Sequence, residues 1–265
     1  MQLASSSVSR SAKSMHRFLS LVILPMLGWV NPLSAQEDLT VAISLDIPPY
    51  IQEAASSGLQ IDIIREALPD RQVTFKQMPY AQLEMAVSEG KTPVSAGVRE
   101  KKAGVAYSRN FVTFVNTAIS KKTDELNITN VKDLAAHPVI TWENADKDLG
   151  EAFEKLFGPG GAARPHYHEV ANQQEQVRRF WEEEGAVIVI DRAIFDTFSR
   201  ELGRDLDRVA YHDLFAPVTA FRVAFKDPAL RDAFNAGLKQ LCESGRYDAL
   251  LKKYNMQPNQ TICGE

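Results

Sequence analysis

Strand-like and helix-like patterns alternate between residues 39 and 98, and this alternation limits the possible folds more than any other feature. Three strand-like runs, residues 39–45, 72–77 and 92–98, are separated by two stretches with helical spacing of apolar residues, 58–68 and 80–88. Strands that alternate with helices pair in parallel, because each helix carries the chain back to the start of the next strand. The segment therefore predicts a mostly parallel sheet with helices on both faces.

A second series of the same kind follows a polar segment at residues 121–125. Strands are expected at residues 138–142, 166–170 and 186–190, and helices at 131–135, 145–157, 172–184 and 191–202. A last strand, residues 217–225, has the extended pattern of the first series, and helices follow it at 228–244 and 246–254.

This order predicts two lobes that the chain joins by two extended crossings, with a cleft between them. We expect one lobe to comprise residues 38–118 and 218–265, and the other to comprise residues 119–217. Two lobes on a two-strand hinge can close around a ligand by rotating about the crossings.

The first 35 residues have the features of a cleavable signal peptide. Basic residues, among them Arg10 and Arg17, precede an apolar core at residues 18–30 that is short for a transmembrane helix. Cleavage after Ala35 would leave 230 of the 265 residues, with Gln36 first in place of the cysteine that a lipoprotein requires. The expected location is the periplasm.

Charge and cysteine content narrow the class of protein further. Three of the 30 Lys and Arg residues lie in the leader, which leaves 27 against 34 Asp and Glu. The resulting net charge of −7 for the mature chain argues against a nucleic-acid partner.

Cys242 and Cys263 are the only cysteines, and an oxidising compartment favours a disulfide between them over two free thiols. His166 and His168 share a strand face without a third ligand, so we expect no metal site and no cofactor.

Candidate binding residues lie where the expected strands end. Arg99 and Lys101 follow the strand at 92–98, and a cation there can hold an anionic ligand group, with Arg gripping a carboxylate through two hydrogen bonds. Tyr50 follows two prolines after the first strand, and Tyr80 follows Pro79 at a strand-to-helix junction, so both rings are candidate cleft walls. The structural alternatives are a solvated basic turn and tyrosines that only cover a core.

Asp191 follows the buried-type strand at 186–190 and opens the next helix. An Asp at such a junction is the usual N-cap of a helix. At the carboxyl end of a strand, its second oxygen can also face a cleft and pair with an ammonium group. Both interpretations stay open at this point.

Six segments in order resemble the periplasmic solute-binding proteins of polar amino-acid ABC transporters. The segments are PPY at 48–50, GLQIDIIREAL at 58–68, REKKAGVAYS at 99–108, VKDLAAHPVI at 131–140, AVIVID at 186–191 and DPALRDAFNAGLKQLCESGRYDALLKKY at 227–254. The resemblance covers essentially the whole mature chain. It implies an α/β, two-lobed type II periplasmic-binding fold, each lobe a mostly parallel sheet flanked by helices. It further implies a monomer that closes on an amino-acid-like solute and delivers it to a membrane ABC permease.

The resemblance also implies roles for single residues. The family holds the ligand α-carboxylate with an Arg in a TPER stretch that precedes FS, and counting back from Tyr107 and Ser108 places Lys101 at that position, with Arg99 two residues away. The equivalent of the family's Thr is Val98, which lacks the hydroxyl. Lys at the Arg position would lose the two-pronged geometry.

The second lobe departs from the family as well. Trp142 and Asp146 are expected to line the cleft where the family commonly has Gly followed by Ser or Thr, and Asp146 would oppose an anion there. Asp191 falls where the family places the carboxylate that receives the ligand ammonium. The ligand is therefore expected to be amino-acid-like and need not be an ordinary α-amino acid; it can be cationic or modified.

Two other functions are compatible with the same fold. Exported lyases that resemble cyclohexadienyl dehydratase share it, and such an enzyme would need an acid or base such as Glu143 or Glu169, both of which are otherwise surface carboxylates. A ligand-sensing module would dock onto a membrane receptor instead of a permease. We expect a binding protein and no catalysis.

Overall fold

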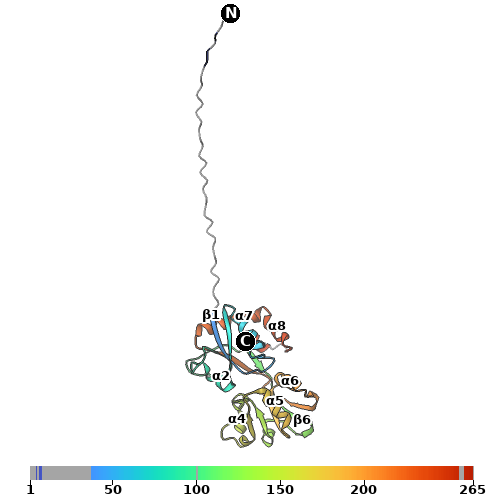
Figure 1. Ribbon diagram of the computed structural model, residues 1–265. Coiled ribbons are helices and arrows are strands. Elements are labelled where there is room, and N and C mark those ends of the chain that lie inside the picture. The colour runs from blue at the N-terminus through green and yellow to red at the C-terminus, as the bar shows by residue number, and fades with distance from the viewer. Residues whose placement is uncertain (1–3, 5, 8–36, 100, 257–259, 265) are drawn as a thin grey trace. The chain divides into compact units, whose positions relative to one another are not determined.

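The computed structural model describes residues 4, 6, 7, 37–99, 101–256 and 260–264. The predicted signal peptide, with its cleavage point after Ala35, lies outside the described residues apart from residues 4, 6 and 7. Within the described ranges, no helix has both the length and the apolar character needed to cross a membrane. The elements below all lie from residue 37 onward (Figure 1).

The first sheet combines strands from the beginning and the end of the described chain. Its strands are β1 (Glu37–Ile43), β2 (Arg71–Gln77), β3 (Val94–Val98), β4 (Ala106–Tyr107), β5 (Val112–Phe114) and β11 (Thr219–Phe225). The order is β2-β1-β3-β11-β4, with β5 also paired to β11. β1 pairs in parallel with β2 and β3, as the alternating pattern predicts, whereas β11 runs antiparallel to each of its partners.

The second sheet is built from the middle of the chain. Its strands are β6 (Asn116–Lys121), β7 (Val139–Thr141), β8 (Tyr167–Glu169), β9 (Val187–Asp191) and β10 (Val209–His212), in the order β10-β6-β9-β7-β8. The strands of the second alternating series, β7, β8 and β9, pair in parallel. β6 and β10 add an antiparallel edge, because β6 enters from the first sheet and β10 precedes the return to it.

The chain passes between the sheets at two short places. Val115 separates β5 from β6, and residues 213–218 separate β10 from β11. Phe114 pairs with Thr219 in the first sheet, and the Asn116 side-chain amide donates a hydrogen bond of 3.1 Å to the Thr219 hydroxyl. The two crossings therefore lie side by side. The lobe boundary expected at residue 118 falls inside β6, and both expected boundaries stay predictions.

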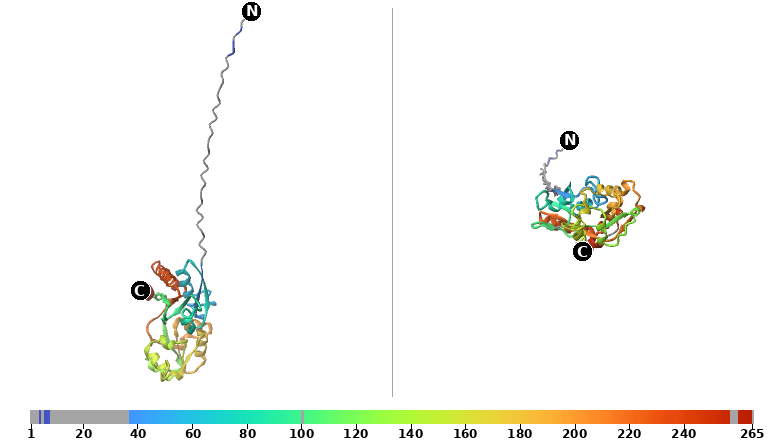
Figure 2. Two further views of the ribbon diagram at one scale, coloured as in Figure 1. Left: turned by 90° about the vertical axis from the view of Figure 1, so that its left-hand side faces the viewer. Right: turned by 90° about the horizontal axis from the view of Figure 1, so that it is seen from below.

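Helices flank both sheets. Around the first sheet lie α1 (Leu59–Ala67), α2 (Tyr80–Ala86), α7 (Pro228–Glu243), α8 (Arg246–Lys253) and α9 (Gln260–Cys263); we call this group the first lobe. Around the second sheet lie α3 (Ala145–Asp148), α4 (Glu151–Phe157), α5 (Gln173–Glu182) and α6 (Arg192–Glu201), which form the second lobe. The C-terminal helices, drawn in red in Figure 2, belong to this lobe, and α7 and α8 both contact α1.

Short polar segments connect these elements, and a disulfide secures the last one. The 3₁₀ turns are Lys122–Asp124, Val131–Ala136, Arg164–His166 and Leu206–Arg208. Cys242 on α7 and Cys263 on α9 form the disulfide that the sequence predicts. It closes a loop with a sequence separation of 21 residues and links the end of the chain to the first lobe.

Two differences from the sequence-based prediction have a local cause. The helix expected over residues 145–157 is split into α3 and α4 by Gly150, whose φ of 92° lies outside the helical range. The strand β10 was not predicted, because its four residues are only partly apolar and its second half is half-buried. Because no strand was expected here, the predicted chain passes from the helix at residues 191–202 directly to the crossing that leads back to the first sheet.

The apolar core runs through both lobes. One group of contacting buried side chains extends from Val41 in β1 and Phe234 in α7 to Ile188 in β9 and Phe195 in α6. A second group, which includes Phe153 of α4, packs on the opposite face of the second sheet. The lobes thus have cores of their own and also meet through apolar contact.

The close packing of α7 on α1 in the first lobe can be tested by a substitution. A methyl group at Gly237 of α7 would lie 2.0 Å from the carbonyl oxygen of Ala67 at the end of α1. Gly237→Ala should therefore lower the free energy of unfolding by about 1–3 kcal/mol in urea denaturation. In a helix with free space the same change would raise it by about 1 kcal/mol, so stabilisation would contradict this packing.

Candidate functional site

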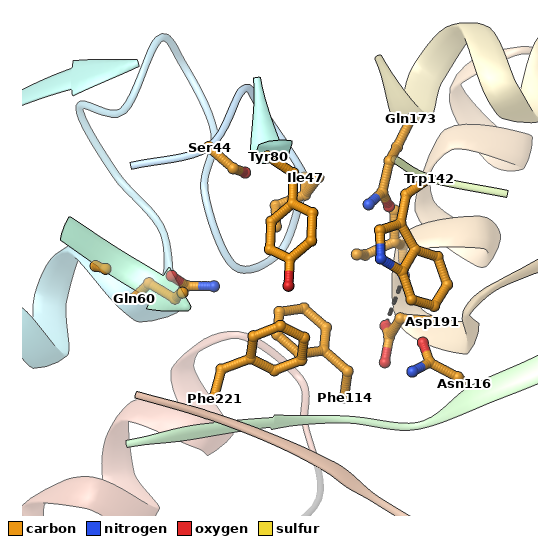
Figure 3. Close-up of a pocket in the computed structure, with 13 residues that line it drawn as sticks. Ser44, Ile47, Gln60, Tyr80, Phe114, Asn116, Trp142, Gln173, Asp191 and Phe221 are labelled. Carbon is orange, nitrogen blue, oxygen red and sulfur yellow. Dashed lines mark hydrogen bonds between the residues drawn. The ribbon is translucent and has the colours of Figure 1, made fainter. Parts of the chain in front are cut away.

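A small cavity lies between the two lobes, and both contribute to its walls (Figure 3). Its volume is about 60 Å³, which is small compared with the roughly 300–1,000 Å³ of typical ligand pockets. The first lobe contributes Ser44, Gln60, Tyr80, Phe114 and Phe221. The second lobe contributes Asn116, Trp142, Gln173, Asp191 and Ile194.

Four aromatic side chains surround much of this cavity. The Phe114 and Phe221 rings meet edge to face with centroids 5.0 Å apart, and the Tyr80 ring lies 6.3 Å from that of Phe221 in a similar arrangement. Trp142 faces this group from the second lobe (Figure 3). The rings expose both apolar area and negatively polarised faces to whatever occupies the cavity.

Asp191 is the charged side chain of the cavity wall, and its hydrogen bonds come from both lobes. Its Oδ1 accepts from the backbone N–H groups of Ala193 (2.9 Å) and Ile194 (3.1 Å), which confirms the predicted N-cap of α6. Its Oδ2 accepts from the N–H of Val115 (2.7 Å) and from the Tyr50 hydroxyl (3.2 Å). The carboxylate is therefore both a cap and part of the cavity wall.

Burial sets the protonation behaviour of Asp191. Its side chain is almost inaccessible, and desolvation raises its pKa from the ordinary value of 3.8 to about 6. The backbone N–H groups of Val115, Ile194 and Ala193 and the Tyr50 hydroxyl oppose that shift by stabilising the ionised form. At neutral pH the group is a buried anion without an ion-pair partner among the described residues.

A second buried carboxylate, Asp148 at the end of α3, joins the lobes beside the cavity. Its Oδ2 accepts from the Tyr80 hydroxyl (3.0 Å) and from Trp142 Nε1 (3.3 Å). The guanidinium of Arg99 donates to its Oδ1 (3.1 Å) and to its backbone carbonyl oxygen (2.6 Å). Burial raises the pKa of Asp148, while the charge of Arg99 and these hydrogen bonds oppose the shift. Sequence reasoning missed this residue.

The predicted anion contacts lie outside the cavity wall. The Arg99 guanidinium is held against Asp148 and lies 5.7 Å from the centroid of the Phe221 ring, in a separate recess that Asn110 and Arg222 also line. Lys101 is exposed. In this structure neither cation contacts the cavity between the lobes.

The other predicted residues divide between the cavity and its surroundings. Tyr80 and Trp142 line it, whereas Tyr50 is buried against Phe114, with ring centroids 4.2 Å apart. Asp146 is also buried but faces Arg164, whose guanidinium lies 3.6 Å away, instead of the cavity.

The two carboxylates considered for catalysis do not line the cavity either. Glu143 accepts a hydrogen bond from the N–H of Ala81 at the start of α2 (3.2 Å), and Glu169 accepts one from the N–H of Asn144 (3.1 Å). Both side chains hold backbone groups in place. No group of three or more His, Cys, Asp or Glu residues in the described part of the chain could hold a metal ion.

Several cavity residues carried no clear signal in the sequence. Phe114 in β5 and Phe221 in β11 lie in strands beside the crossings, and neither was singled out as a candidate from the sequence. Gln60 and Gln173 lie at the starts of α1 and α5 and have buried side-chain carbonyl oxygens that accept no hydrogen bond within the described chain. Both residues line the cavity, but these two oxygens have almost no accessible surface, so they are not free acceptors for a ligand in it.

The fold and the cavity define a two-lobed binding protein, in which a small site is assembled from both halves of the chain. Residues 39–257 match the family model described as bacterial extracellular solute-binding proteins, family 3, and the chain belongs to that family. No curated protein sequence matches the chain.

Solved structures with the same fold share little sequence with this chain. ArtJ, the arginine-, lysine-, histidine-binding protein of Geobacillus stearothermophilus, is 15% identical with a TM-score of 0.69, covering 86% of this chain and 100% of its own. EhuB in complex with hydroxyectoine is 22% identical (TM-score 0.68; 87% and 95% covered). A histidine kinase sensor domain with similarity to periplasmic binding proteins is 16% identical (TM-score 0.70; 85% and 100% covered).

The raised pKa of Asp191 predicts a specific pH dependence of stability. Between pH 4 and pH 6 the folded protein holds a proton on Asp191 that the unfolded chain has lost, so rising pH favours unfolding across this window. The difference in unfolding free energy between wild type and Asp191→Asn should fall by about 2 kcal/mol from pH 4 to pH 7. Urea titrations of both proteins at each pH would measure it, and a flat difference would contradict the assignment.

The Asp148 contacts predict that this residue holds the lobes together. Asp148→Ala removes the acceptor of Trp142 Nε1 and the carboxylate that faces Arg99, and it leaves the Tyr80 hydroxyl with Glu84 Oε1 (2.9 Å) as its acceptor. The change should lower the unfolding free energy by about 1–3 kcal/mol. We also expect a larger radius of gyration in small-angle X-ray scattering without ligand. Glu151→Ala removes an exposed carboxylate in the next helix and serves as the control. Equal scattering from both variants would refute the role of Asp148.

Proposed function

We propose that this protein binds a small amino-acid-like solute in the cavity between its lobes and delivers it to a membrane ABC permease, without chemical turnover. The observation that carries this proposal is the cavity itself. Residues from both lobes of a family 3 solute-binding protein enclose a small cavity, with a buried carboxylate and four aromatic rings in its wall.

Binding in this site would be linked to closure of the lobes. A ligand that contacts Tyr80 and Phe114 in the first lobe and Trp142 and Asp191 in the second gains its full set of contacts only when both walls are present. Such a ligand favours the closed arrangement by its differential contacts. The short crossings at Val115 and residues 213–218 are where we expect the backbone to absorb this motion.

Export to the periplasm completes the proposal. The predicted signal peptide, the family to which the chain belongs and the disulfide between Cys242 and Cys263 support this location, because disulfides form and persist in oxidising compartments. The monomeric state and the permease partner follow the family resemblance. We propose no cofactor.

A ligand screen tests the proposal directly. Amino acids, polyamines and betaines are added to the mature protein, and its melting temperature is measured; a ligand at 100 times its Kd should stabilise the native state by about 2.7 kcal/mol. Asp191→Ala should abolish the shift for an amine-bearing ligand because the cavity loses its charge. Asp207→Ala, which removes an exposed carboxylate of the second lobe outside both crossings, is the matched control. An unchanged response of Asp191→Ala would contradict the role of Asp191.

A sensory role is the second candidate, favoured by the likeness to a histidine kinase sensor domain. Both roles use the same ligand site and differ in the membrane partner. Co-purification from detergent-solubilised membranes, with and without the ligand found in the screen, would recover a permease for one role and a receptor for the other. The lyase alternative predicts conversion of prephenate or arogenate to an aromatic product by the purified protein.

A further inference from the structure

The cavity between the lobes is negatively charged and has no positive counterpart. Asp191 is the one charged side chain among the described residues that line it; Gln60, Gln173 and Asn116 provide neutral amides. A ligand carboxylate would meet a like charge here, whereas a cation would meet a compensating one.

The residue that could have balanced a ligand carboxylate is already paired within the protein. Arg99 donates to both the side chain and the backbone carbonyl oxygen of Asp148, whose carboxylate also accepts from Tyr80 and Trp142. A ligand anion would therefore have to compete with Asp148 for the guanidinium of Arg99. The Phe221 ring lies between Arg99 and the cavity, since it lines the cavity and the guanidinium lies over it.

Asp191 has little acceptor capacity left for the N–H groups of a ligand. The backbone N–H groups of Val115, Ala193 and Ile194 donate to it, and the Tyr50 hydroxyl divides its single hydrogen between Asp191 Oδ2 and the carbonyl oxygen of Thr113, each 3.2 Å away. A primary ammonium brings three N–H groups that need acceptors. An alkylated ammonium needs only the charge and apolar contact, so it loses less on entering this site.

The aromatic walls fit the same chemistry. The faces of Tyr80, Phe114, Trp142 and Phe221 carry negative partial charge and attract a cation that has shed its water. Rings around a carboxylate provide apolar contact for alkyl groups together with compensation for the positive charge.

We propose, as an extension of the binding function above, that the solute is a small alkylated ammonium compound recognised through its cationic head group by the aromatic rings and Asp191. A carboxylate on the same molecule is not required for binding.

The first experiment compares ligands that differ only in charge. Isothermal titration calorimetry on the mature protein uses choline, its uncharged isostere 3,3-dimethylbutan-1-ol, and L-arginine. We expect choline to bind at least about tenfold more tightly than the isostere, because a desolvated cation–π contact contributes on the order of a tenfold factor or more. Equal binding of choline and the isostere would overturn the proposal.

The second experiment removes ring faces while keeping apolar volume. Phe114→Leu and Trp142→Leu should each weaken choline binding roughly tenfold, and Trp142→Phe should restore part of the loss. Phe75→Leu is the matched control, because Phe75 is a half-buried ring of β2 beneath Arg65, away from the cavity. Melting curves without ligand establish that each variant folds. If Phe114→Leu does not fold, the comparison of Trp142→Leu with Trp142→Phe still tests the proposal. Unchanged choline affinity in both leucine variants would contradict the proposal.

The ligand series separates this inference from the binding function on which it rests. Tight binding of L-arginine with no binding of choline would overturn the alkylated-ammonium assignment and leave solute binding intact. Failure of every compound in this series and in the broader screen would count against both. Choline binding that Asp191→Ala abolishes supports both.

Discussion

The contact between the two lobes at the first crossing depends on the buried carboxylate of Asp191. Its four hydrogen bonds come from the first crossing, from Tyr50 of the first lobe and from the first turn of α6 in the second. A buried anion is tolerated only while such donors surround it. If the lobes move, these donors must stay close to Asp191, because the buried carboxylate would otherwise lose its hydrogen bonds without gaining contact with water. We therefore expect any such motion to occur by changes in the backbone around Asp191.

Asp148 joins the lobes in a different way. Its donors, Tyr80, Trp142 and Arg99, are long side chains that can follow a moving partner, whereas three of the four donors to Asp191 are backbone groups. Asp191 is thus held mainly by backbone groups, and Asp148 by side chains that can adjust. The contact with Asp148 also affects the chemistry of the cavity, because it engages Arg99.

The alternating pattern of the sequence was sufficient to predict the fold, because strand–helix alternation leaves few topologies for a chain of this length. The break at Gly150 and the short strand β10 were not predicted, since both depend on contacts that propensity does not encode. For the site, Asp191 was found because a strand end fixes its position. Tyr50 was expected in the cleft wall, yet it does not line the cavity and packs against Phe114, which does. The pairing of Arg99 with Asp148 joins residues 49 positions apart in different lobes, which spacing along the chain does not reveal.

Asp191 also borders a second, larger recess on its other side, lined by Tyr50, Val115 and Tyr247. A single carboxylate thus forms part of the partition between two compartments, and its electric field extends into both. A cation bound in the cavity, as proposed above, would make the potential in the outer recess less negative. The second recess would then respond to binding through the charge of Asp191, without any movement of the backbone.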